Sequence, residues 1–364
     1  MAVGYGMQLA RLEVHDFRVV KTASLDLHSR LNIFVGTNGA GKTSLLEALH
    51  LLGTGRSFRS RDVEKVIRWG ARELSVFGEG VDRTGARRRL GVVKGRLGGR
   101  IRLDGQDERG MASMARVLPL AVFGPESLDL VEGAPDRRRS LVDWTLFHVE
   151  QGYAESLHRY RRALKQRNAT LRMGGRRRDA RVWEEELAQE AQRLDLSRRH
   201  YVREVEPHVE CALAGMGPGP LEINYRRGWS QEDTLQEALE RSWETDCGRG
   251  WTSPGPHGAD LLLRLGRRHA RDALSRGEKK ILVAALVLGH VAYIRERCGS
   301  APVVLADDIP SELDERGRKW FIERLVLSNS QIFTTTLGRE LLPLPLDVEH
   351  KVFHVEQGVI TNLL

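Results

Sequence analysis

The sequence has little cysteine. Only three cysteines occur in 364 residues, at Cys211, Cys247 and Cys298, and they are scattered without the spacing of metal ligands. This pattern excludes a disulfide-stapled scaffold and gives no support to a zinc site. We therefore predict reduced thiols in a cytoplasmic protein.

Long apolar segments are also lacking. The longest extends from Ile281 to Ile294 and is interrupted by Gly289 and His290. A membrane-spanning helix needs about 20 apolar residues, so this segment predicts a buried core helix instead. The first residues lack the basic-then-apolar pattern of a secretion signal. We expect a protein that is neither exported nor inserted in a membrane.

Basic residues exceed acidic ones and are clustered. The formal net charge is +8, whereas 41% apolar and 29% charged residues are typical of a soluble globular protein. Such an excess permits a polyanionic partner such as nucleic acid, although each cluster alone is more often a solvated face than a contact. Near the predicted phosphate-binding segment described below, the candidates for DNA contact are Arg56, Arg59 and Arg61.

The chain is long enough for two lobes, and its patterning changes along its length. Short alternating strands fill roughly the first hundred residues, and strands alternate with helices again towards the C-terminus. Between them, apolar residues at helical spacing predict two long helices joined by the glycine-containing turn at 173–178, an antiparallel arm over about 140–215. We predict one α/β lobe from 1–117 and 301–364, and a mainly helical lobe at 118–300 that packs rather than projects as a free coiled coil.

The segment Gly36–Thr43 indicates the chemistry of this protein more specifically than any other part of the sequence. It fits the pattern G-x-x-x-x-G-K-[ST] at every fixed position, after the predicted strand Leu31–Val35 and before a predicted helix. Glycines allow backbone N–H groups to surround phosphate oxygens, the helix N-terminus adds positive potential, Lys42 reaches the outer phosphates and the Thr43 hydroxyl suits Mg²⁺. The predicted ATP-binding residues are Gly36, Thr37, Asn38, Gly39, Ala40, Gly41, Lys42, Thr43 and Ser44.

A second segment ends a buried strand in two carboxylates. Asp307 and Asp308 follow the apolar run 303–306. Hard oxygen at a fixed strand tip is what Mg²⁺ requires, so Thr43 and Asp307 are the predicted metal ligands. Asp308 is the predicted catalytic residue, which orients or deprotonates the attacking water. In isolation, an acidic pair at a strand end is more often a helix cap or a surface loop.

Two further motifs flank this strand. Leu274–Lys280 opens a long apolar helix and resembles the signature motif of the ABC ATPase superfamily, with Ser275, Arg276, Gly277 and Glu278 as its functional residues. Ser311 and Asp314 stand where that superfamily has its D-loop. The order of motifs resembles SMC-like heads, which implies an ABC-type ATPase lobe with an antiparallel β part and an inserted helical lobe. It also implies that the signature of one protomer completes the ATP site of another.

A finer resemblance covers the chain from about residue 9 onward. The segments that carry it are His15–Arg18, Gly55–Arg59, Gly133–Asp143, Leu164–Asn168, Gly255–His257 and Asp307–Asp314. In this order they resemble the RecF family. The resemblance implies a nucleoid-associated protein of recombinational gap repair that binds ATP and Mg²⁺, dimerises with ATP on double-stranded or gapped DNA, hydrolyses ATP slowly, and helps RecR and RecO load RecA.

Some residues depart from the wider superfamily, and other classes stay open. Thr334–Thr336 stand where transporters carry a histidine, and Asp308 where they carry glutamate, which favours weak hydrolysis. A transporter ATPase subunit is the main alternative, and it would need a partner permease. A small-molecule kinase could use the same phosphate-binding segment, but it would not need the signature and D-loop motifs.

Overall fold

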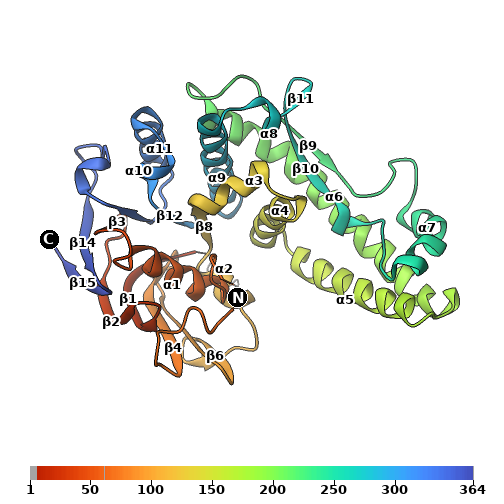
Figure 1. Cartoon of the computed structure of the whole chain (residues 1–364), viewed down its shortest axis with the longest axis horizontal. Helices are drawn as coiled ribbons and strands as arrows, with labels where there is room; N and C mark the ends of the chain where they lie inside the picture. The colour runs from red at the N-terminus through yellow and green to blue at the C-terminus, as the bar shows by residue number, and fades with distance from the viewer. Residues whose placement is uncertain (1–5, 61, 364) are drawn as a thin grey trace. The chain divides into compact units, whose positions relative to one another are not determined.

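A computed structural model describes residues 6–60 and 62–363 (Figure 1). The chain forms two compact units, each considered by itself. Unit 1 comprises the chain up to Leu128, the segment Ala212–Met216, and Arg276 onward; unit 2 comprises Asp129–Cys211 and Gly217–Ser275. These boundaries differ from 117 and 300, which the sequence pattern suggested.

Unit 1 contains an antiparallel sheet built from the N-terminal strands. Its order is β2-β1-β4-β5-β6-β7, and neighbouring strands alternate buried and exposed side chains, as a sheet with one covered face requires. The strands predicted in this part of the chain are confirmed. Their bounds are β1 Met7–Phe17, β2 Val20–Asp26, β4 Glu73–Asp82, β5 Arg87–Gly95, β6 Gly98–Leu103 and β7 Gln106–Asp107.

The second sheet of unit 1 positions the site. Its order is β15-β14-β3-β13-β12-β8, and every pair is parallel except the C-terminal hairpin β14–β15. The carboxyl ends of β3, β12 and β13 therefore meet at one edge of the sheet. The bounds are β3 Leu31–Val35, β8 Leu120–Phe123, β12 Val303–Ala306, β13 Ile332–Thr336, β14 His350–Glu356 and β15 Val359–Asn362.

Helices cover these sheets and enclose the core of unit 1. Helix α1 contributes Leu45, Leu46, Leu49 and Leu52 to a cluster that the two sheets also line. Helix α9 is buried from Ile281 to Ile294, as the apolar run predicts. The bounds are α1 Lys42–Thr54, α2 Ala112–Val117, α9 Arg276–Cys298, α10 Ile309–Glu312 and α11 Glu315–Leu327. Strand β8 and helix α9 belong to unit 1 because β8 pairs with β12 and α9 packs against β8.

Unit 2 is mainly helical and carries a small sheet of order β11-β10-β9. The predicted single helix before the 173–178 turn is in fact two, because Gly152, with φ +86°, breaks it. The bounds are α3 Asp129–Glu132, α4 Pro135–Val149, α5 Tyr153–Arg172, α6 Arg177–Leu213, α7 Leu235–Arg249, α8 Ala270–Ala273, β9 Glu222–Arg226, β10 Asp260–Leu265 and β11 Arg268–His269.

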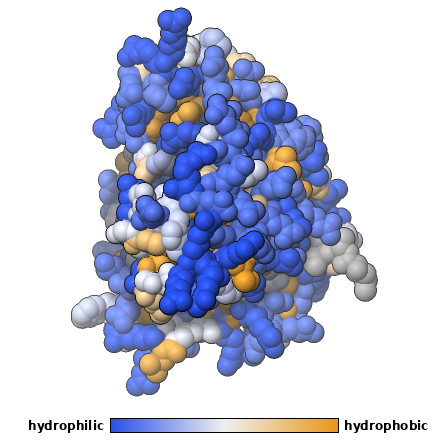
Figure 2. Space-filling model, turned by 90° about the vertical axis from the view of Figure 1, so that its right-hand side faces the viewer, coloured by the Kyte–Doolittle hydropathy of each residue, from blue (hydrophilic) through white to orange (hydrophobic). Residues whose placement is uncertain are grey.

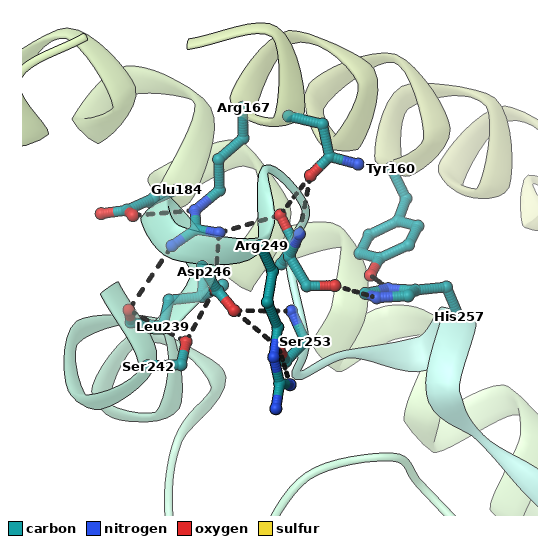
Figure 3. A network of polar contacts seen from close by, with 11 residues as sticks. Tyr160, Arg167, Glu184, Leu239, Ser242, Asp246, Arg249, Ser253 and His257 are labelled. Atoms are coloured by element: carbon teal, nitrogen blue, oxygen red, sulfur yellow. Dashed lines mark hydrogen bonds and ion pairs between the residues drawn. The ribbon is translucent and has the colours of Figure 1, made fainter. Parts of the chain in front are cut away.

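The arm of unit 2 is packed through a buried arginine. Arg167 of α5 is fully buried; its Nε lies 2.9 Å from Glu184 Oε1 on α6, and its Nη1 lies 2.9 Å from Asp246 Oδ2 on α7 (Figure 3). Asp246 also accepts hydrogen bonds from Ser242 and Ser253, so its carboxylate is satisfied. The three helices are thus joined by one ionic centre, and α5 and α6 form a packed hairpin rather than a free coiled coil.

A second polar contact closes the same region. The Tyr160 hydroxyl lies 2.5 Å from His257 Nδ1, and His257 Nε2 lies 2.9 Å from the Thr252 carbonyl (Figure 3). This pattern fits a neutral imidazole that donates through Nε2 and accepts through Nδ1. Burial lowers the pKa of His257, and raises that of Tyr160, because it disfavours the charged form of each.

Polar side chains dominate the face of the molecule that is drawn in Figure 2. Figure 2 shows one face on which hydrophilic residues predominate and hydrophobic residues are scattered in small groups. Among the helices of the described residues, none is long and apolar enough to cross a membrane.

Candidate nucleotide-binding site

The phosphate loop occupies the turn between β3 and α1. Strand β3 ends at Val35 and α1 begins at Lys42, so the structure places the loop where the sequence predicted it. Gly39 and Gly41 have φ values of +79° and +112°. Side chains rarely tolerate this left-handed region, so both positions favour glycine and let the backbone turn its N–H groups inward.

Lys42 closes over this loop. Its Nζ donates to the carbonyls of Gly36 at 2.7 Å and Thr37 at 2.9 Å, and the side chain is buried. Burial lowers the pKa of Lys42, and the nearby Asp308 and Asp307 carboxylates partly oppose this by favouring the ammonium. The cation is therefore held at the mouth of the loop, where the outer phosphates of a nucleotide bind.

Asp307 joins the acidic strand end to the phosphate loop. Thr43 Oγ1 lies 3.0 Å and 3.1 Å from its two carboxylate oxygens, although the two residues are far apart in sequence. Asp307 is buried, and desolvation raises its pKa, whereas hydrogen bonds from Thr335 and Thr43 lower it. A hydroxyl and a carboxylate at this spacing are hard-oxygen ligands of the kind Mg²⁺ prefers, so the two residues fit the predicted metal site.

The Asp308 side chain has a different hydrogen-bond partner from that of Asp307. Its backbone adopts φ 48° and ψ 50°, a left-handed conformation that is strained for most residues and tolerated by aspartate. Its Oδ2 accepts a hydrogen bond from Ser311 Oγ at 2.6 Å. Its Oδ1 is buried and has no hydrogen-bond partner among the residues that the structure describes. One carboxylate oxygen is thus oriented, while the other is left for a ligand or water.

Thr335 links the two aspartates and was not predicted as a site residue. Its Oγ1 donates to Asp307 Oδ1 at 2.7 Å and accepts from the Asp308 backbone N–H at 2.8 Å. The parallel pairing of Ala306 with Thr334 sets this contact. In the sequence, the only signal is a threonine run at the end of a buried strand.

A second set of unpredicted contacts surrounds Glu47, which lies on α1. Glu47 is fully buried and accepts from Arg18 Nε at 2.9 Å and Arg18 Nη2 at 2.6 Å, and also from the Ser57 hydroxyl. The Ser57 hydroxyl in turn accepts from the Arg59 and Ser60 N–H groups. The segment after α1 is therefore fixed to the helix that carries Lys42.

The predicted DNA-contact arginines have different surroundings. Arg59 and Arg56 are exposed. Burial raises the pKa of Asp307, and the positive charge of Arg59 is close enough to oppose this in part. Burial lowers the pKa of Lys94, and the positive charge of Arg56 lowers it further. Arg61 lies outside the described residues.

The signature and D-loop residues lie at helix starts. Ser275, the last residue of unit 2, precedes α9, and Arg276, Gly277 and Glu278 form the first turn of that helix with exposed side chains. Space around the Gly277 Cα is open, since a Cβ there would meet nothing within 4 Å. Ser311 orients Asp308, and Asp314 caps α11 by accepting from the Gly317 N–H at 2.8 Å.

This fold and this site define an ATPase of the ABC type with an SMC-like head. Residues 8–361 match the RecF/RecN/SMC N terminal domain family. The chain is 41% identical over 363 residues to the DNA replication and repair protein RecF of Azotobacter vinelandii, covering 98% of this chain and 99% of that protein. The chain belongs to the RecF family.

Solved structures agree with this assignment. The recombination mediator protein RecF with ATP, in the RecFOR pathway, has a TM-score of 0.88 at 25% identity, covering 99% of this chain and 98% of that chain. The Smc head bound to the C-winged helix domain of ScpA has a TM-score of 0.61 at 16% identity, covering 98% and 97%, and supports the fold alone.

Proposed function

We propose that this chain is an ATP-switched DNA-binding protein of DNA replication and repair. The observation that carries the proposal is the contact of Thr43 with Asp307, because it assembles the phosphate loop and the acidic strand end into one site. Family membership supports the same conclusion, since the relatives are DNA replication and repair proteins.

The proposed ATP site assigns a role to each group. The loop 36–44 binds the phosphates through backbone N–H groups, and Lys42 neutralises the outer phosphate charge. Thr43 and Asp307 would hold Mg²⁺, which supplies charge neutralisation at the phosphates when bound. Asp308, with one oxygen fixed by Ser311, orients the attacking water and takes its proton. We propose that hydrolysis is slow and is stimulated by DNA.

The proposed switch is assembly. Ser275, Arg276, Gly277 and Glu278 are proposed to contact the outer phosphate of ATP bound to a second copy, since a helix start that is exposed and has open space at Gly277 suits an anion. The ATP-bound dimer would bind double-stranded or gapped DNA in the nucleoid and work with RecR and RecO to load RecA. The net charge of +8 supports a DNA partner.

A transporter ATPase subunit is not favoured. The match to the RecF/RecN/SMC family covers residues 8–361, and the RecF relatives cover nearly the whole chain.

The decisive variant is Ser275→Arg, which places a bulky cation at the start of α9. We expect Kd for Mg-ATP to stay within about twofold, whereas ATP-dependent dimerisation, hydrolysis and duplex binding fail together, because the bulky side chain blocks the docking of the partner's phosphate at the helix start. The measurement is sedimentation with and without Mg-ATP, alongside nucleotide binding. Ser230→Arg, at another exposed serine of unit 2, is the control and should dimerise normally.

Two results would count against the proposal. If the Ser275→Arg protein still dimerises with ATP, the signature does not act between protomers. If duplex affinity of the wild type is the same at low and physiological salt, phosphate contacts do not drive DNA binding, since each such contact adds about one unit to the log–log salt slope.

A further inference from the structure

The phosphate loop lies against a segment from the far end of the chain. Strand β14 pairs in parallel with β3, so that His354 lies opposite Val35, the last residue before the loop. After β14, the chain reverses at Gln357 and Gly358, with φ values of +48° and +80°. Two consecutive positive φ values are typical of a tight hairpin turn, and this turn leads into β15.

One hydrogen bond joins this turn to the loop. The Gly358 N–H donates to the Ala40 carbonyl at 2.8 Å. In a planar trans peptide, the carbonyl of Ala40 and the N–H of Gly41 point in opposite directions. Because the carbonyl is held outward on the hairpin, the Gly41 N–H is directed to the opposite side, into the loop, where phosphate oxygens bind.

Steric packing holds the same elements together. A Cβ on Gly36 would lie 2.2 Å from the Val355 carbonyl oxygen, and a Cβ on Gly358 would lie 2.2 Å from the Val19 carbonyl oxygen. A Cβ on Gly41 would lie 2.9 Å from Val19 Cγ2. The backbones of the loop and β14, and of the C-terminal turn and the β1–β2 turn, therefore approach too closely for a side chain at Gly36 or Gly358, and a side chain at Gly41 would require Val19 to move.

We propose that Gly358 is a positioning residue of the nucleotide site. The C-terminal turn holds the peptide between Ala40 and Gly41 in its phosphate-binding orientation before the nucleotide arrives, and so increases affinity for the triphosphate without touching it. The inference rests on the proposed binding of ATP at the phosphate loop. By linkage, nucleotide must stabilise the C-terminal turn to the same degree.

The test compares Gly358→Ala with Gly85→Ala in the full chain. Gly85 also has φ +80°, in the β4–β5 turn, but a Cβ there would meet nothing within 4 Å. Both variants place a Cβ on a backbone with φ +80°, so they carry the same kind of backbone strain. Only the Cβ of Gly358→Ala also meets the backbone of the β1–β2 turn, and it therefore displaces the turn whose N–H is bonded to Ala40. The probe is a fluorescent ATP analogue with Mg²⁺, followed by titration.

We expect Kd to rise about tenfold or more in Gly358→Ala and to stay within twofold of wild type in Gly85→Ala. In steady-state turnover, KM should rise while kcat at saturating ATP changes little. Equal Kd values for the two variants would overturn the inference. Binding that is equally weak in the wild type and in Lys42→Ala would instead overturn the ATP site itself, so the two failures are distinguishable.

Hydrogen exchange of the wild-type protein gives a second test that needs no variant to fold. Saturating Mg-ATP should slow exchange of the Gly358 amide about fivefold or more. The Gly85 amide, which is bonded to the Asp82 carbonyl at 3.0 Å, is the internal reference and should not change. Exchange at Gly358 that is unaffected by nucleotide would also overturn the inference.

Discussion

The two units bury charge in different ways. In unit 2, the Arg167 guanidinium is surrounded by acceptors that the protein supplies, the carboxylates of Glu184 and Asp246 among them. In unit 1, the Lys42 ammonium is bonded to backbone carbonyls of the phosphate loop. Asp308 keeps a buried oxygen without a partner in the described part of the chain.

This difference between Arg167 and Lys42 indicates which buried charges stabilise the fold and which serve ligand binding. Buried charge that meets its counter-charge inside the same unit holds helices together, and a ligand could add little to it. A buried ammonium that is hydrogen-bonded to backbone carbonyls favours a ligand of opposite sign, and perturbed groups of this kind gather at functional sites. The comparison predicts that variants at the Arg167 centre of unit 2 affect folding, whereas variants at the unit 1 site affect binding and rate.

The largest effect is expected at Arg167. Arg167→Leu leaves two carboxylates, of Glu184 and Asp246, buried without their cation and should lower the free energy of unfolding by about 3–5 kcal/mol. Chemical denaturation measures this. Arg162→Ala, which breaks the exposed ion pair with Glu186, is the control and should cost about 1 kcal/mol or less. Similar losses in both would erase the distinction between the units.

A large effect on rate is expected at Asp308. Asp308→Asn should keep Mg-ATP affinity within about twofold, because Thr43 and Asp307 remain, and should slow hydrolysis about 100-fold or more. The variant should accumulate as the ATP-bound dimer, which single-turnover kinetics and sedimentation can follow. Turnover at the wild-type rate would show that Asp308 is not the catalytic carboxylate.

Removal of Lys42 should affect binding rather than folding. Lys42→Ala removes a charge-assisted contact to phosphate, so ATP affinity should fall about 10- to 100-fold. The nucleotide-free protein should lose little stability, because the buried ammonium has already lost much of its hydration. Lys319→Ala, at an exposed lysine of α11, is the control for titration. If the nucleotide-free Lys42→Ala protein has a much lower free energy of unfolding than the wild type, Lys42 serves folding as well as binding and the contrast with Arg167 fails.

The smallest expected effect is the loss of stability of unit 2 in mild acid through His257. Burial lowers the pKa of His257 below its ordinary value of 6.5, so in mild acid the unfolded chain takes up a proton that the folded chain resists. Stability of unit 2 should therefore fall as pH drops through and below 6.5. His257→Gln should flatten this dependence in denaturation curves recorded between pH 5 and 7. An unchanged slope would mean that other groups set the acid sensitivity.

The sequence predicted what local rules determine. The phosphate loop, its strand and its helix follow from glycine spacing and hydrophobic pattern, and the acidic strand end follows from the run before Asp307. The division of the first arm helix into α4 and α5 was not predicted, because the apolar pattern continues through the break at Gly152. Periodicity records which face is buried and does not record where a helix stops.

Contacts set by strand register could not be predicted. Thr335 and Gly358 reach the site because β13 and β14 pair with β3, and nothing in their neighbours along the chain indicates this pairing. The partners of Glu47 have the same origin in packing. The residues that support the site are brought there by the topology of the sheet. The residues that bind phosphate lie in one continuous motif, so the sequence alone can identify them.

The neighbours of β3 also bear on synthesis. Strand β3 ends at Val35, but β13 begins at Ile332 and β14 at His350. At about 5–20 residues per second, a ribosome needs roughly 15–60 s to make the intervening chain. Throughout that interval β3 lacks both neighbours, and unit 2, which ends at Ser275, becomes complete in sequence before either neighbour is made. The nascent chain therefore has no finished nucleotide site until β13 and β14 have been made, and until then both edges of the apolar strand β3 are unpaired with these strands.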